Sequence, residues 1–289
     1  MRTGHAWKTM TVLVVLAALV ALAAPAQAGG DGAKNLWYLA LGDSLSVGVQ
    51  PDAAGVNHPT ANGYADQLYQ TLKVTKPKLQ LKKLGCAVTE TSENMLRGPS
   101  DCRGQYHLRI QLADAVEFLA KNRGSVALVT IDIGANDIEP CGGLGGIDPA
   151  CVQEAFSEVF ANLPRILAAL RLAAGPHVPI VGMNYYNPFL AAWLVGETEL
   201  AEQSNEVVAS FNGLLGSIYR FFRVPVADVA AAFDTTAFEP LVDIGVGVPV
   251  PLNVARICGY TYMCTPFQNI HATDAGYEVI TQAFLDVLP

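Results

Sequence analysis

Three residues of this chain, Ser44, Asn136 and His271, are of types that together can perform nucleophilic catalysis. A serine hydroxyl becomes a good nucleophile when a base removes its proton, and histidine is the commonest such base. An asparagine amide can donate a hydrogen bond to the oxyanion that develops on an attacked carbonyl, and losing one such donor typically costs about 10²–10³ in turnover. The three types together predict acyl-transfer chemistry.

Each of the three also has a plain structural interpretation. The serine lies in GDSLS at 42–46, where glycine and aspartate are common in a strand-to-helix turn. The asparagine lies in GAND at 134–137 and can cap the next element. The histidine lies in IHATDAGY at 270–277 and can be a solvated surface residue. Taken singly, the motifs leave both interpretations open.

The hydrophobic pattern predicts an alternation of strands and helices around these motifs. Short apolar runs predict strands at 36–41, 79–84, 126–133, 178–183 and 224–229. Longer amphipathic stretches predict helices at 64–72, 108–121, 152–173, 200–222 and 274–288. Pro164 indicates a kink or a break in the third of these helices.

Such an alternation indicates a mostly parallel sheet with helices on both faces. In these sheets the functional site lies beyond the carboxyl ends of the strands. Ser44 follows the first predicted strand, Asn136 follows the third, and His271 lies in a predicted loop before the last helix. We therefore expect the three side chains at one edge of the sheet.

The three motifs in this order resemble the GDSL, or SGNH, hydrolases, a family of esterases and lipases with secreted bacterial members. The resemblance extends over essentially the whole chain after residue 28. It implies an α/β fold, a flavodoxin-like three-layer α/β/α sandwich with a parallel sheet of about five strands. It also implies that Ser44 is the nucleophile, that Asn136 donates to the oxyanion, and that His271 is the base.

The chain departs from the family pattern at two places. The family often has an aspartate three residues before the histidine, where this chain has Gln268 followed by Asn269. A backbone carbonyl or an acid from elsewhere would then orient the imidazole. The family also places a glycine after the second strand, whose N–H joins the oxyanion hole. In this chain Val88 or Thr89 falls where that glycine is expected, and Gly85 is the only glycine nearby. Any residue except proline can supply a backbone N–H, so Gly85 is the candidate donor and the other two positions stay open.

The chain has six cysteines, and an even number in an exported protein predicts disulfides. Six cysteines allow fifteen pairings, among which a sequence cannot choose by itself. Their positions form three local pairs, which predict the disulfides Cys86–Cys102, Cys141–Cys151 and Cys258–Cys264. The spacings match no common zinc motif, so no metal site is expected.

The first residues predict an export signal. Arg2 and Lys8 flank the start of an apolar run at 10–24, and Ala-Gln-Ala at 26–28 is a small-residue cleavage site. The run is shorter than the roughly 20 residues of a spanning helix, which favours cleavage over a membrane anchor. We expect a signal peptide at 1–28, one hydrolase domain at 29–289, and a secreted protein.

The net charge of the chain limits the classes of binding partner that we expect. The formal net charge of the chain is −8, and the predicted signal holds two basic and no acidic residues, so the remainder carries −10. An acidic protein of this kind argues against nucleic acid and anionic membrane surfaces as partners. We expect a monomer that acts on a small-molecule ester or a lipid, with no metal or organic cofactor and no stable membrane insertion.

The expected function is the hydrolysis of carboxylic esters. The aromatic, apolar segment 185–194 either lines an acyl pocket or packs into the core, and its sequence allows both. A carbohydrate O-deacetylase is the alternative within the same family. A secreted binding protein on an inactivated scaffold is the alternative outside enzymes, because a fold does not by itself establish an activity.

Overall fold

The computed structural model describes residues 35–143 and 145–288, so the predicted signal peptide at 1–28 lies outside the described residues. Five strands form one parallel sheet: β1 (Leu36–Gly42), β4 (Leu79–Lys83), β5 (Val126–Asp132), β8 (Ile180–Met183) and β9 (Val226–Ala227). Their order across the sheet is β4-β1-β5-β8-β9. The first strand in the chain therefore lies between the second and the third, which is the flavodoxin-like order.

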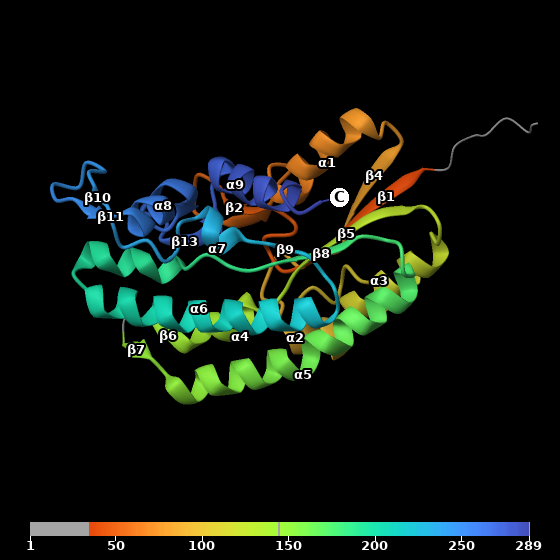
Figure 1. Ribbon diagram of the computed structural model, residues 1–289, viewed down its shortest axis with the longest axis horizontal. Coiled ribbons are helices and arrows are strands. Elements are labelled where there is room, and N and C mark those ends of the chain that lie inside the picture. The colour runs from red at the N-terminus through yellow and green to blue at the C-terminus, as the bar shows by residue number, and fades with distance from the viewer. Residues whose placement is uncertain (1–34, 144, 289) are drawn as a thin grey trace, which may run out of the picture. The chain divides into compact units, whose positions relative to one another are not determined.

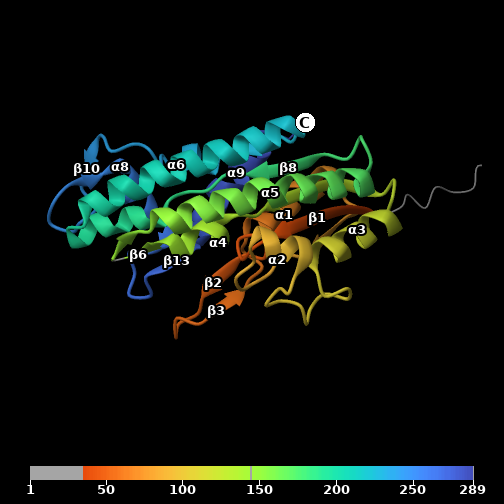
Figure 2. The ribbon, with the colours of Figure 1, turned by 90° about the horizontal axis from the view of Figure 1, so that it is seen from below.

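Helices cover both faces of this sheet, as Figures 1 and 2 show. One layer contains α2 (Ser92–Arg97), α3 (Gln111–Lys121), α5 (Pro149–Ala174) and α6 (Thr198–Phe221). The opposite layer contains α1 (Tyr64–Thr75), α7 (Val229–Ala232), α8 (Leu252–Tyr260) and α9 (Asp274–Leu285). The predicted three-layer α/β/α sandwich with five parallel strands is confirmed. No helix of the described residues is long and apolar enough to cross a membrane.

The central strands are buried on both faces, which explains why their sequences are continuous apolar runs. In β1, Leu39 and Leu41 are fully buried, and in β5 Val129 and Ile131 are fully buried. Burying one such side chain contributes about 1.5–3 kcal/mol. A parallel sheet packed on both sides needs apolar residues at every position rather than at alternate ones.

Side-chain N-caps determine where two of the helices begin. Helix α5 begins three residues before its predicted start, because the Asp148 side chain accepts the backbone N–H groups of Ala150 and Cys151 at 2.9 and 3.3 Å. It runs through Pro164 without a break. Helix α9 begins after Thr273, whose hydroxyl accepts the Gly276 N–H at 3.2 Å.

Several short elements at the sheet edge were not predicted. They are α4 (Ala135–Ile138), the 3₁₀ helices η1 (Glu139–Cys141) and η2 (Pro188–Val195), and four small antiparallel hairpins. The hairpins are β2 (Val49–Pro51) with β3 (Asn57–Pro59), β6 (Gly142–Gly143) with β7 (Gly146–Ile147), β10 (Leu241–Val242) with β11 (Val250–Pro251), and β12 (Thr261–Tyr262) with β13 (Asn269–Ala272). His271 therefore lies in a strand, not in the predicted loop.

The three predicted disulfides are present. Cys86–Cys102, Cys141–Cys151 and Cys258–Cys264 have Cα–Cα distances of 5.6, 5.4 and 5.0 Å. Their sequence separations of 16, 10 and 6 correspond to about 2–3 kcal/mol each in the chain-entropy description. Cys86–Cys102 joins two loop segments, whereas Cys141–Cys151 ties η1 to the first turn of α5, and Cys258–Cys264 ties α8 to the loop before β13.

Candidate active site

The turn after β1 holds Ser44 at the carboxyl edge of the sheet. Gly42 has a φ of +129°, and a Cβ atom there would lie 1.7 Å from Asp132 Oδ1, so this position requires glycine. The Asp43 carboxylate accepts the Leu45 N–H at 2.9 Å, and the Asp43 N–H donates to the Asp132 carbonyl at 3.1 Å. These bonds turn the backbone sharply and leave Ser44 partly exposed.

Gln111, a fully buried residue at the start of α3, fixes the beginning of this turn. Its side-chain oxygen accepts the Gly42 N–H at 2.7 Å, and its side-chain nitrogen donates to the Gly42 carbonyl at 2.9 Å. The same nitrogen donates to Glu90 Oε1 at 3.0 Å. Gln111 therefore ties the serine turn to the loop that precedes α2.

Ser44 and His271 meet although 227 positions separate them in the chain. Ser44 Oγ lies 2.9 Å from His271 Nε2. Asn269 Oδ1 lies 2.7 Å from His271 Nδ1 and accepts the His271 backbone N–H at 2.9 Å. Because a side-chain carbonyl oxygen only accepts, Nδ1 carries the proton and Nε2 presents its lone pair to the serine hydroxyl. This is the tautomer that a general base requires.

Asn269 is itself held in place. Its side-chain nitrogen donates to Asn57 Oδ1 on the β2–β3 hairpin at 2.8 Å. Gln268, at the usual aspartate position, is exposed with a φ of +46° and makes no hydrogen bond to His271. The group that orients the imidazole is therefore a neutral side-chain amide. It is neither the backbone carbonyl nor the distant acid that the sequence left open.

Burial sets the protonation state of His271. The side chain is 7% exposed, and this desolvation lowers its pKa to about 4. Desolvation penalises the imidazolium, and no neighbouring carboxylate counteracts it. At neutral pH the imidazole is therefore neutral and free to accept a proton.

Two N–H groups at this edge of the sheet are candidate donors to an oxyanion. Asn136 lies at the start of α4, beside Ser44 in the wall of one pocket. Its side-chain nitrogen donates to the Glu90 carbonyl at 3.1 Å, and its second hydrogen remains for a ligand. The Ser44 N–H has no acceptor among the described residues. Both donors come from carboxyl ends of adjacent strands, as the sequence predicted for this edge.

Gly85 packs against the turn that contains Ser44 but is not part of the pocket wall. It is buried and does not line the pocket, and a Cβ atom there would lie 1.7 Å from Ser46 Oγ. Ser46 is itself fully buried, and its hydroxyl donates to the Asp43 carbonyl at 2.7 Å. The close approach explains why the position is a glycine. Its N–H as an oxyanion donor stays a prediction.

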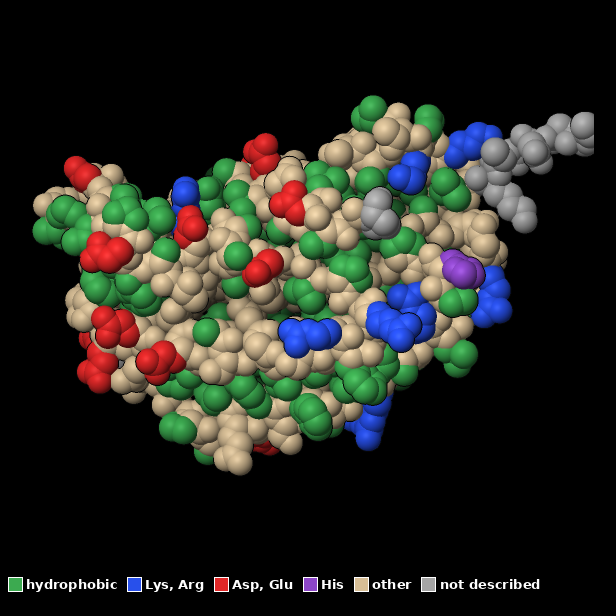
Figure 3. Space-filling view, viewed as in Figure 1, with side chains coloured by type: hydrophobic (Ala, Val, Ile, Leu, Met, Phe, Trp, Pro, Cys, Tyr) green, Lys and Arg blue, Asp and Glu red, His purple; other side chains and the backbone are tan. Residues whose placement is uncertain are grey.

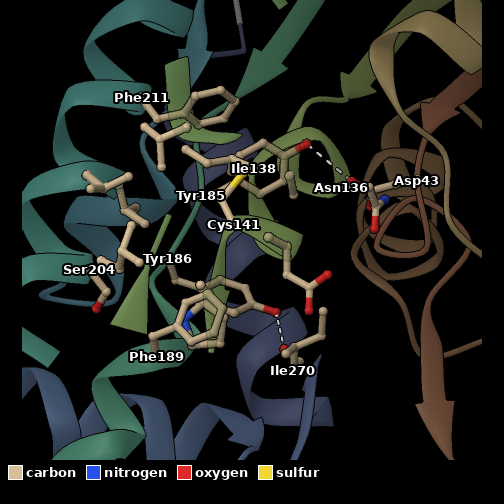
Figure 4. Close-up of a pocket in the computed structure, with 18 of the residues that line it drawn as sticks. Asp43, Asn136, Ile138, Cys141, Tyr185, Tyr186, Phe189, Ser204, Phe211 and Ile270 are labelled. Atoms are coloured by element: carbon tan, nitrogen blue, oxygen red, sulfur yellow. Dashed lines mark hydrogen bonds between the residues drawn. The ribbon is translucent and has the colours of Figure 1, made fainter. Parts of the chain in front are cut away.

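The pocket at Ser44 is largely apolar, and Figure 4 shows its walls. Tyr185 donates to Asp43 Oδ2 at 3.3 Å, and Tyr186 donates to the Ile270 carbonyl at 2.7 Å, so both phenol groups are satisfied. The apolar lining includes Ile138, Ile147, Val152, Phe189, Leu200, Val207, Val208 and Phe211. The segment 185–194 therefore contributes to the pocket, while its Leu190 packs into the core.

A family model described as the GDSL-like lipase/acylhydrolase family matches residues 40–279. The chain belongs to this family. No curated protein matches the chain.

Solved structures of other proteins share the fold of this GDSL hydrolase. An extracellular lipase from Streptomyces rimosus matches with a TM-score of 0.56 and 18% identity, over 88% of this chain and 100% of that one. A lipase from a goat rumen metagenome matches with a TM-score of 0.53 and 20% identity, over 87% and 96%. The acetyl xylan esterase Axe2 from Geobacillus stearothermophilus matches with a TM-score of 0.51 and 16% identity, over 87% of this chain and 93% of that one.

Sequence reasoning missed three polar residues of this GDSL hydrolase. Asn269 bonds to the His271 imidazole, Gln111 bonds to the serine turn, and Asp137 of the GAND motif accepts from the backbone and hydroxyl of Ser92 at 2.8 and 2.6 Å. Asn269 could have been found, because residues two apart in a strand share a face and His271 lies two positions on. Gln111 offered no signal, since its contacts depend on the packing of α3.

Four buried carboxyl groups surround the site of this GDSL hydrolase. Burial raises the pKa of Asp43 and Glu90 to about 7, that of Asp137 to about 6, and that of Asp132 well above its usual range. Each of these groups therefore holds its proton more tightly in the folded chain than in the unfolded chain.

We expect the folded protein to be more stable at pH 5 than at pH 8. Between about pH 4 and 7 the folded state binds more protons at these carboxyl groups, so stability falls as pH rises through that window. His271 acts oppositely, because its folded pKa is lowered, but it is one group against four. Thermal unfolding at both pH values measures this. An equal or higher Tm at pH 8 contradicts it, and Asp137→Asn should weaken the dependence.

The neutral support of His271 leads to a second expectation. Replacing Asn269 by Asp places a carboxylate against Nδ1 and should raise the imidazole pKa by about 1–3 units. The acid limb of kcat/KM, which reports the free enzyme, should then move from near pH 4 toward neutrality. The Asn57 amide can rotate to donate to the new carboxylate.

The control for this variant is Asn57→Asp, which adds the same charge one residue further from the imidazole. It should move the acid limb much less. Profiles of kcat/KM between pH 4 and 8 for the three proteins decide the matter. Coincident acid limbs for wild type and Asn269→Asp would show that His271 is not the titrating base.

Proposed function

We propose that this GDSL hydrolase cleaves carboxylic esters through an acyl-enzyme formed on Ser44. His271 Nε2 takes the Ser44 proton as Oγ attacks the carbonyl carbon, and Asn269 holds the imidazolium by its Nδ1–H. The Ser44 N–H and the Asn136 amide stabilise the tetrahedral oxyanion. His271 then protonates the departing alkoxide, and a water molecule, deprotonated by the same imidazole, releases the acid.

One observation carries this proposal. Ser44 Oγ lies 2.9 Å from the unprotonated nitrogen of His271, at the wall of a pocket that also contains Asn136. The residues that we propose as nucleophile, base and oxyanion donor thus line one cavity, which supports the proposal. A chance serine–histidine contact would not also place the amide of a third strand end beside it.

The pocket favours an acyl ester of a hydrophobic alcohol or acid over an acetylated polysaccharide. Its walls are mostly aliphatic and aromatic side chains, whereas a sugar requires several hydrogen-bonding partners. We therefore propose lipid or short-acyl esters as the substrate class. The carbohydrate O-deacetylase is the second candidate, and the apolar lining weighs against it.

The test is a panel of acyl esters of graded chain length assayed beside acetylated xylan and acetylated chitooligosaccharides. We expect turnover of the simple esters, with kcat/KM at least about tenfold above that for the acetylated sugars. A fluorophosphonate should also label the protein. A folded protein that neither reacts with the fluorophosphonate nor turns over any ester supports the binding-protein alternative.

We also propose that the protein is exported and acts outside the cytoplasm. Its three disulfides suit an oxidising compartment. The predicted signal at 1–28 supplies the route. Mass spectrometry of protein secreted by a bacterial host should find a mature N-terminus near residue 29.

A further inference from the structure

Glu139 places a carboxylate in the wall of the otherwise apolar pocket. It is the first residue of η1, which continues directly from α4, and it follows Asn136 by three positions. Residues three apart on a helical run lie on the same side, and both Glu139 and Asn136 line this pocket. The carboxylate therefore belongs to the same cavity as Ser44 and His271.

Unlike the other carboxylates around the site, that of Glu139 has no partner. Asp43 accepts from Leu45 and Tyr185, and Asp137 accepts twice from Ser92. Within residues 35–143 and 145–288, the Glu139 carboxylate makes no hydrogen bond or ion pair. Partial burial raises its pKa above the ordinary value, and desolvation is the cause. Because Glu139 is only partly buried, water can hydrate its carboxylate, and the carboxylate stays available to a ligand that enters the pocket.

Aromatic residues line the same pocket as Glu139. Phe189 packs against Gly142, the residue that follows η1: a Cβ atom on Gly142 would be 3.2 Å from the Phe189 ring. Tyr186 also lines the pocket and stacks on Phe233 with ring centroids 4.6 Å apart. No lysine or arginine is among the residues that line the pocket. A carboxylate beside aromatic rings attracts an organic cation, through its charge and through the ring faces.

The surface at this end of the domain is negatively charged, like the Glu139 carboxylate (Figure 3). Figure 3 shows acidic side chains gathered toward the end of the domain that carries the β10–β11 hairpin, and basic side chains mostly toward the other end. Helix α6 lines the pocket with one side, and its N-terminal half carries the exposed Glu199, Glu202 and Glu206. A field of this sign raises the local concentration of cations.

We propose that Glu139 selects esters whose alcohol portion carries a quaternary or alkylated ammonium group. This deepens the proposed function and rests on it. The acyl portion lies along the aliphatic walls toward α6, and the cationic portion lies between Glu139 and the aromatic rings. A polyhydroxylated alcohol would meet one carboxylate and few other polar groups, so the pocket does not suit it.

The test uses two isosteric substrates, butyrylcholine and 3,3-dimethylbutyl butyrate, which differ in charge and hardly in shape. We expect wild-type kcat/KM to be at least about tenfold higher for the cation, and Glu139→Gln to reduce this ratio by about tenfold. The ratio should also fall as the carboxylate is protonated at acidic pH. Effects common to both substrates, such as protonation of His271, cancel in the ratio.

Glu206→Gln is the matched control, since it removes the same charge from the exposed surface of α6. It should leave most of the ratio intact. A ratio unchanged by Glu139→Gln, or an equal loss for both substrates, overturns the selection role. Turnover of the neutral ester by wild type tests the proposed function separately.

A binding measurement tests the role of Glu139 without relying on catalytic turnover. Calorimetry of butyrylcholine with Ser44→Ala, and with Ser44→Ala combined with Glu139→Gln, should give a Kd about tenfold weaker for the double variant. Equal affinities for the two proteins overturn the proposal even if the enzyme hydrolyses esters well.

Discussion

The Ser44→Ala variant is expected to lose covalent reaction with a fluorophosphonate and to lose about 10⁴-fold or more of its ester hydrolysis. The hydroxyl oxygen is the atom that would form the acyl bond, so removing it leaves only the residual effect of the oxyanion donors. The side chain is partly exposed, and within the described part of the chain it bonds only to His271. Thermal unfolding should therefore give a Tm close to that of wild type.

Ser46 provides the matched control two residues away. Its buried hydroxyl donates to the Asp43 carbonyl, so Ser46→Ala should cost about 1 kcal/mol of stability and keep its labelling. Labelling is read by intact mass after reaction, and hydrolysis by initial rates. A folded Ser44→Ala protein that still hydrolyses esters at near the wild-type rate would remove Ser44 from the mechanism.

The second large effect is expected for His271→Ala, with a loss of about 10³-fold or more in kcat. Among the described residues, His271 is the hydrogen-bond partner of the Ser44 hydroxyl, so without the imidazole none of them is placed to take its proton. The loss should persist across the pH range in which the hydroxyl stays protonated. Steady-state kinetics at pH 7, far above the His271 pKa of about 4, measures it.

His58 is the control histidine, since it is exposed on the β2–β3 hairpin and pairs with Asp52 at 3.2 Å. His58→Ala should retain full activity. Substitution of the buried carboxylates near the site should also cost less than His271→Ala once folding is accounted for. An equally essential carboxylate that leaves the fold intact would indicate a relocated acid rather than a neutral amide behind His271.

The fold was predictable because its information is local and repeated. The runs at 36–41 and 126–133 are mostly apolar, with Thr130 and Asp132 as the exceptions in the second run, and a strand with that composition is buried on both faces. The prediction was less accurate for β9: the apolar run at 224–229 predicted a six-residue strand, but β9 has only two residues. Pairing with β8 ends there because α7 begins at Val229, and a sequence run does not reveal where a neighbour stops.

The contact between Ser44 and His271 was predictable from their motifs, but the residues that support it were not. Ser44 and His271 lie in motifs of several residues, whereas Asn269 acts through a side-chain bond that requires an extended backbone at 269–272. Interpreting that segment as a loop hid the two-residue periodicity. Glu139 carried no motif, and its place in the pocket follows from the helical turn that begins after Gly134.

Gly85 illustrates a different limit. A glycine near the predicted oxyanion hole has two explanations, a free N–H or a close approach, and the sequence does not separate them. The contact with Ser46 shows the second explanation at work in the structure. Steric requirements of this kind depend on what packs opposite, which only the folded chain specifies.

The distance of 227 positions between the two reacting side chains has a consequence for the order of events during synthesis. A nascent chain acquires its serine turn early and its imidazole near the end. Until β13 docks beside the β2–β3 hairpin, where Asn57 meets Asn269, the hydroxyl has no proton acceptor. Recovery of hydrolysis in a refolding time course would thus lag behind the recovery of secondary structure, and would report closure of the chain's two distant segments.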